Sequence, residues 1–168
     1  MAKVISTGAT NKANNPYYFT GKNIKEVGAR FSVAAADVAD GDNYILAQGL
    51  SYADRVDSVV MEAGHIALTG ATDNDLGFYE MDEDGNLTEI DKDILLDGVT
   101  LASAVTTWLD LLNLNTSLDR EKNIGELVDK SVEQQVANLC LVLTTNTKST
   151  ATNTVLGIKS RIECANTN

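Results

Sequence analysis

The middle of the chain alternates apolar and polar residues, reading Arg55-Val-Asp-Ser-Val-Val-Met-Glu62, then Asp75-Leu-Gly-Phe-Tyr-Glu80, the acidic turn Asp82-Glu-Asp-Gly-Asn86, and Ile90-Asp-Lys-Asp-Ile-Leu-Leu-Asp-Gly-Val-Thr-Leu101. A period of two is typical of β-strands with one buried face. Asp84-Gly85 between two such segments is a strong hairpin signal. The stretch therefore predicts an antiparallel β-domain with polar connections.

Flanking segments extend this prediction to about seven to eight strands. Apolar positions from 101 to 112 recur at the spacing of a short amphipathic helix, and 124–128 fits another helical turn. The sequence thus predicts a mainly β, jelly-roll-like antiparallel β-sandwich with one or two short helices. We expect its core to include Phe31, Val33, Ile45, Val56, Val60, Leu76, Phe78, Leu139, Leu141, Leu156, Ile158 and Ile162.

Residues 1–27 differ from the rest, because they are rich in Asn, Lys, Thr and Gly and show no sustained period. They are interpreted as an extended N-terminal arm, and residues 28–168 as the β-sandwich domain. An aromatic cluster of Tyr17, Tyr18 and Phe19 indicates that the arm docks on an apolar surface, either of its own domain or of a neighbouring subunit. We take this cluster as the partner-binding site.

Composition narrows the possible partners. The 168 residues carry 24 acidic and 13 basic side chains, a net charge of −11. Since phosphate repels such a surface, and no Lys/Arg cluster occurs, binding to nucleic acid or to an anionic membrane is not expected. No apolar run approaches the ~20 residues that span a bilayer, and no secretory signal is recognisable at the N-terminus.

The acidic turn is the sharpest local motif. Asp82, Asp84, Asn86 and Asp91 fall at ligand positions of a calcium-loop template, with Gly85 at the turn. The ends of the motif depart from the template, and its flanks are strands rather than helices. A solvated hairpin turn is therefore the preferred interpretation, with calcium binding as the weaker alternative, and no metal or cofactor is expected.

No catalytic constellation accompanies these elements. Asp91, Asp93 and Asp97 could pair as in glycoside hydrolysis but are interpreted as exposed loop charge. His65 lacks a nucleophile motif beside it and is interpreted as structural. Cys140 and Cys164 are expected to be buried thiols, unless neighbouring strands bring them into a disulfide. The chain is therefore predicted not to be an enzyme.

Four segments resemble virion proteins of tailed bacteriophages, of the capsid-decoration or auxiliary structural type. The segments are Asp37-Val-Ala-Asp-Gly-Asp42, Ala53-Asp-Arg-Val-Asp-Ser-Val-Val60, Thr72-Asp-Asn-Asp-Leu-Gly-Phe-Tyr79 and Ile90-Asp-Lys-Asp-Ile-Leu-Leu-Asp-Gly98. The resemblance implies a β-sandwich made in the bacterial host cytoplasm that binds the outside of an icosahedral shell and cements its capsomers.

Its implied partners are the major capsid protein and neighbouring copies of itself, in a homo-oligomer such as a trimer. Two alternatives stay open at this point. One is a receptor- or carbohydrate-binding module of a tail or head fibre, and the other is a calcium-stabilised interaction module.

Overall fold

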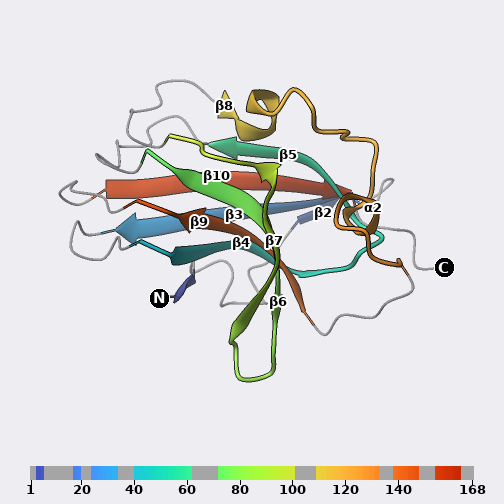
Figure 1. Cartoon of the computed structure of the whole chain (residues 1–168), viewed down its shortest axis with the longest axis horizontal. Coiled ribbons are helices and arrows are strands. Elements are labelled where there is room, and N and C mark those ends of the chain that lie inside the picture. The colour runs from blue at the N-terminus through green and yellow to red at the C-terminus, as the bar shows by residue number, and fades with distance from the viewer. Residues whose placement is uncertain are drawn as a thin grey trace.

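A computed structural model describes residues 3–5, 17–19, 24–33, 40–61, 72–100, 109–132, 138–147 and 154–163. These ranges are mainly β and form two five-stranded sheets (Figure 1). The strands are β1 (Lys3–Ile5), β2 (Tyr17–Phe19), β3 (Ile24–Val33), β4 (Asp42–Leu50), β5 (Arg55–Met61), β6 (Asn74–Met81), β7 (Leu87–Leu96), β8 (Leu109–Asp110), β9 (Leu139–Thr145) and β10 (Thr154–Glu163).

The first sheet has the order β1-β4-β9-β6-β7 and the second has the order β2-β3-β10-β5-β8. All pairs are antiparallel except β1 with β4. The central strands β9 and β10 come from the end of the chain, so each sheet closes only when distant segments meet. Within the described ranges no helix has both the length and the apolar character that a membrane span requires.

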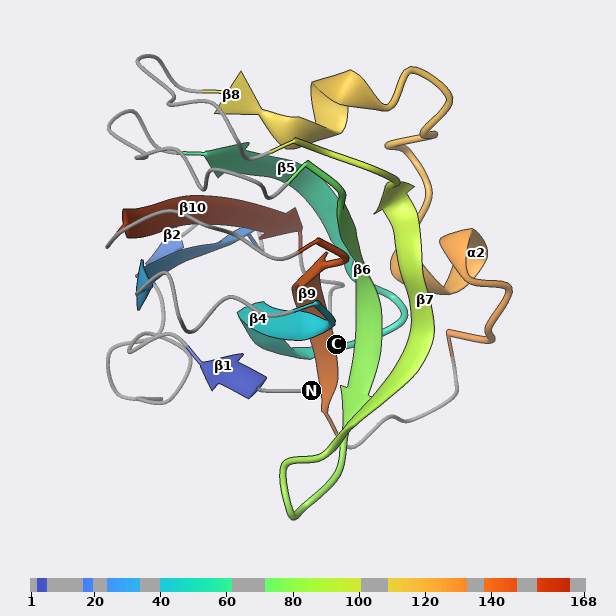
Figure 2. The same ribbon diagram turned by 60° about the vertical axis from the view of Figure 1, so that its left-hand side comes forward.

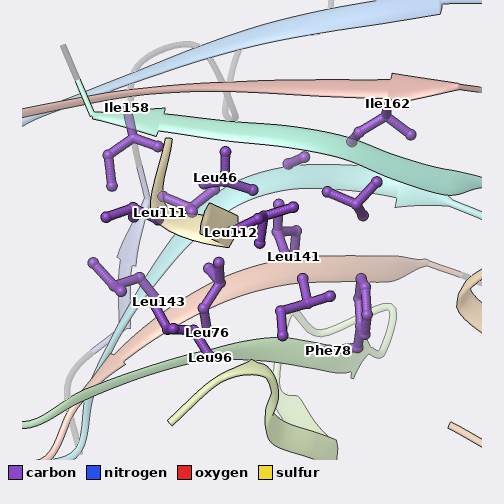
Figure 3. Close-up of a cluster of buried hydrophobic side chains, with 14 of the residues drawn as sticks. Leu46, Leu76, Phe78, Leu96, Leu111, Leu112, Leu141, Leu143, Ile158 and Ile162 are labelled. Carbon is purple, nitrogen blue, oxygen red and sulfur yellow. The ribbon is translucent and has the colours of Figure 1, made fainter. Parts of the chain in front are cut away.

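The main core lies between the two sheets (Figure 3). The first sheet contributes Leu46, Leu76, Phe78, Leu141 and Leu143, and the second contributes Ile158 and Ile162. Burying one such side chain is worth about 1.5–3 kcal/mol. Of the predicted core residues, those found buried are Ile45, Val56, Leu76, Phe78, Leu139, Leu141, Ile158 and Ile162.

Val60 is the exception, since it is only half-buried while Val59 is fully buried. The cause is a bulge in β5: Arg161 pairs with Ser58, but the next residue of β10, Ile162, pairs with Val56. One extra residue in a strand reverses the alternation beyond it. The predicted inward position of Val60 is therefore wrong. The side chains of the remaining predicted core residues, Phe31, Val33 and Leu156, lie outside the described part.

The N-terminal region enters both sheets where it is described. β1 pairs with β4 at one edge of the first sheet, and β2 pairs with β3 at one edge of the second. β3 already begins at Ile24, so the boundary predicted after residue 27 falls inside a strand. The strand that contains Arg30 therefore starts earlier in the chain than the sequence predicts.

The predicted helix from 101 to 112 is corrected at its C-terminal end, and residues 101–108, with Trp108, lie outside the described ranges. Leu109–Asp110 is strand β8, and Leu111–Leu114 is a 3-10 helix, η2. The Asp110 carboxylate accepts a hydrogen bond from Leu112 N at 3.1 Å, which caps η2.

The predicted helical turn near Ile124 is confirmed as α2 (Ile124–Leu127). Asn123 and Glu126 form a capping box at its start. Ile124 N donates to Asp54 O and Gly125 N donates to Tyr52 O, both at 2.8 Å, so α2 is fixed to the connection between β4 and β5.

Candidate functional site

The hairpin of β6 and β7 projects beyond the rest of the molecule in two different views (Figures 1 and 2). Its base belongs to the first sheet, where β6 pairs with β9 on one side and β7 on the other. Its tip is the predicted acidic turn, with Met81 and Leu87 as the last paired residues. The Asp84-Gly85 hairpin signal in the sequence is thereby confirmed.

The tip is closed by its own hydrogen bonds. The two carboxylate oxygens of Asp82 accept from Asn86 N at 2.6 Å and from Asn86 Nδ2 at 2.8 Å. Gly85 has a φ of 81°, which suits glycine, and its N–H donates to Asp82 O. The bonds from Asn86 lower the pKa of Asp82. The Asp82 oxygens that would bind a calcium ion thus already accept hydrogen bonds from Asn86.

The four candidate calcium ligands are not brought together. Asp91 lies within β7, paired with Phe78, while Asp82, Asp84 and Asn86 lie at the tip. Among the described residues, no three His, Cys, Asp or Glu side chains are grouped so that they could hold a metal ion. The tip has the geometry of a hydrogen-bonded turn.

Calcium is accordingly expected to leave the stability unchanged. A ligand that binds only the folded state raises the melting temperature by mass action, whereas at the tip Asn86 already binds both carboxylate oxygens of Asp82. We expect thermal melts with millimolar calcium and with chelator to agree within about 1 °C. Magnesium at the same ionic strength is the control for general screening. A rise specific to calcium and removed by Asp82→Asn would contradict this interpretation of the tip.

Asp91 and Asp93 lie in strand β7 rather than in a loop, which corrects the prediction for these two residues. The pKa of Asp91 is raised, mainly by burial and to a smaller extent by a hydrogen bond with the Asp93 side chain. Asp93 itself is exposed. Asp97 lies in the turn that follows β7.

Exposed acids cover the outer part of the hairpin. Glu83, Asp84 and Glu89 are exposed, and no ion pair within the described part of the chain involves them. A concentrated negative charge on a projecting element favours encounter with a basic surface. The hairpin is therefore the described element best placed to contact a partner.

The predicted docking cluster Tyr17, Tyr18 and Phe19 forms β2. Its backbone pairs with Ile24, Lys25 and Glu26 of β3, at one end of the second sheet. The side chains of β2 lie outside the described part, as do His65 and Cys164. Whether the cluster binds a partner stays a prediction.

A second apolar cluster, separate from the main core, lies on the far face of the first sheet and was not predicted as such. It contains Tyr79 and Val142, together with Ile45 and Cys140, whose burial the sequence did predict. Cys140 is buried, as predicted, and its Sγ donates to Asn138 O at 3.7 Å. The signal was available in the sequence, because Leu139-Cys-Leu-Val-Leu143 is apolar at every position and so indicates a strand buried on both faces.

The chain was compared with protein-family models, curated proteins and solved structures, and none of them matches it.

Proposed function

We propose that the protein is a non-enzymatic structural component of a tailed-phage virion, which binds the outside of the capsid and stabilises contacts between capsomers. In this proposal the two sheets form a jelly-roll-like β-sandwich that serves as a rigid body. The bound partners are the major capsid protein and neighbouring copies of the chain. The proposal is first suggested by a resemblance to decoration proteins in the segments around Asp37, Arg55, Thr72 and Ile90.

The observation that carries the proposal is the projecting acidic hairpin on a compact two-sheet body. A cement protein needs a stable core and elements that reach a neighbour. The β6–β7 hairpin supplies such an element, with Glu83 and Asp84 exposed at its tip. The net charge of −11 suits the exterior of a particle, since packaged DNA would repel it from inside.

Sheet edges provide the second means of contact. β2 ends the second sheet and β7 ends the first among the described strands. Edge strands offer backbone donors and acceptors to a partner. In the proposal, Tyr17, Tyr18 and Phe19 dock on the shell or on a neighbouring copy, and the hairpin tip adds charge complementarity.

Co-sedimentation with capsids that lack the protein tests this function. We expect saturable binding at a ratio near the number of quasi-equivalent sites on the shell. Reversing the tip charge with Glu83→Lys plus Asp84→Lys is expected to weaken binding about tenfold, because two favourable charge contacts become repulsive. The matched control is Asp40→Lys plus Asp97→Lys, which makes the same change in net charge at exposed positions away from the tip.

The control variant is expected to bind like the native chain. Equal weakening by both variants would show that net charge rather than the hairpin matters. Absence of saturable binding by the native chain would overturn the proposed function, and binding of a few copies per particle would place the protein at a unique vertex instead of on the shell.

A further inference from the structure

In the first sheet, the side chains of Lys92 and Asn146 converge on one carboxylate oxygen of Asp75. Asp75 Oδ2 lies 2.9 Å from Lys92 Nζ and accepts a hydrogen bond from Asn146 Nδ2 at 2.6 Å. Lys92 Nζ also donates to Asn146 Oδ1 at 3.2 Å. The amine of Lys92 therefore sits against the carboxamide of Asn146, and the Asp75 carboxylate bridges both groups.

The fold holds this triad in place from several directions. Asp75 belongs to β6 and pairs with Thr144 of β9, two residues before Asn146. Gly98 N donates to the other oxygen of Asp75 at 3.2 Å, and Asn146 N donates to Asp73 O at 2.9 Å. The Asp75 side chain is only 3% exposed. A carboxylate so buried and so fully bonded is pre-organised rather than free to reorient.

Lys92 reaches Asp75 because β7 departs from regular pairing. A Cβ added to Gly77 would lie 2.1 Å from Asp91 O and 2.4 Å from Lys92 C, so the β7 backbone runs directly over Gly77. Gly77 and Asp75 are two residues apart in β6 and share one face. Because the β7 backbone crosses over Gly77, Lys92 lies on the same face as Asp75.

We propose that Lys92 and Asn146 become joined by an intramolecular isopeptide bond, with Asp75 as the catalytic carboxylate. The Lys92 ammonium gives a proton to Asp75, and the neutral amine attacks Cγ of Asn146. The bond from Cγ to Nδ2 then breaks. Asp75 passes protons from Nζ to the departing Nδ2, which leaves as ammonium, while Nζ keeps one hydrogen as the new amide. No oxidant, metal or cofactor is consumed.

One oxygen of Asp75 can serve both proton transfers because it contacts both nitrogens. In the resting state the Asp75 carboxylate raises the pKa of Lys92, and Asn146 and Lys92 lower the pKa of Asp75 despite its burial. The pair thus rests as an ion pair, and the reaction begins when the proton moves to Asp75. Glu89 and Tyr79, two further titratable groups nearby, also raise the pKa of Lys92.

The product would link β7 covalently to the residue after β9, across β6. It would fasten the base of the projecting hairpin to a central strand of the sheet. A covalent link between distant positions stabilises a fold by restricting the unfolded chain. This inference does not depend on the proposed function, since the chemistry requires only the chain itself.

Mass spectrometry of the full chain under denaturing conditions tests the bond. We expect a mass lower than the sequence value by one ammonia, about 17 Da. Proteolysis is expected to give a branched peptide in which the Lys92 and Asn146 segments are joined. Lys92→Arg retains a cation that can pair with Asp75, but arginine stays protonated and cannot attack, so this variant is expected to have the full mass.

Cyclisation of Asn146 onto its own backbone would release the same mass, and the variants separate the two reactions. A mass deficit that persists in Lys92→Arg, or a native chain with full mass and only linear peptides, would overturn the proposal. Asp75→Asn keeps the shape of the side chain but cannot accept the proton, and it is expected to abolish the branched peptide. A branched peptide in Asp75→Asn would overturn the role assigned to Asp75.

Discussion

Replacing Gly77 by alanine is expected to destabilise the protein by about 3 kcal/mol or more, because the added methyl group would overlap backbone atoms of β7, which cannot rotate away as the end of a side chain could. Its Cβ would lie 2.1 Å from Asp91 O and 2.6 Å from Lys92 O. The β7 strand must then lift away from β6, which breaks pairing on both sides of the crossing. Thermal melts should show a midpoint lower by about 6–12 °C for a chain of this size.

Gly49→Ala is the matched control. Gly49 has a φ of 71°, yet a Cβ there would meet nothing within 4 Å. The same chemical change should therefore cost only the backbone strain, about 1 kcal/mol. Equal losses in the two variants would show that β7 does not cross over Gly77. Because the crossing also positions Lys92, Gly77→Ala should reduce the amount of branched peptide as well.

The hairpin illustrates what the sequence can and cannot predict. Alternation in β6 and the Asp84-Gly85 turn were sufficient to place the two strands and the tip. The irregular pairing was not predictable, since Leu76 pairs with Leu96 while Phe78 pairs with Asp91. A two-residue step along β6 thus matches a five-residue step along β7. Nothing in the hydrophobic pattern encodes such an insertion, although an isolated glycine in a strand does signal close backbone approach.

The candidate sites, too, were predictable only in part from the sequence. The acidic turn is recognisable from its residues, but only the structure reveals that both carboxylate oxygens of Asp82 accept hydrogen bonds from Asn86. The triad of Asp75, Lys92 and Asn146 was not recognised, because its members lie far apart in the sequence. Each residue type is ordinary alone, and only the strand order β7-β6-β9 brings the three together. Sequence periodicity gives strands and faces but not the order of strands in a sheet.

Val59→Asp is expected to prevent folding. Val59 is completely buried in the core between the sheets, and its neighbours Val56 and Met61 are also buried. A carboxylate there would be desolvated without a partner. The expected loss exceeds about 4 kcal/mol, a large part of the ~5–15 kcal/mol that a domain of this kind has available. We expect the Val59→Asp variant to be found in the insoluble fraction, or to give a circular dichroism spectrum without the signal of β-structure.

Val60→Asp separates the two possible registers of β5. Val60 is half-buried and lies between the buried Val59 and Met61, so in the extended strand its side chain points away from the core. An aspartate there keeps its contact with water, and the change should cost no more than about 1 kcal/mol. The regular alternation that the sequence predicts puts Val60 in the core, and it would make Val60→Asp more destabilising than Val59→Asp. If the Val60→Asp variant is soluble and melts cooperatively while the Val59→Asp variant is unfolded, the bulge at Asp57 is established. One extra residue at Asp57 turns Val59 inward while it keeps Val56 buried.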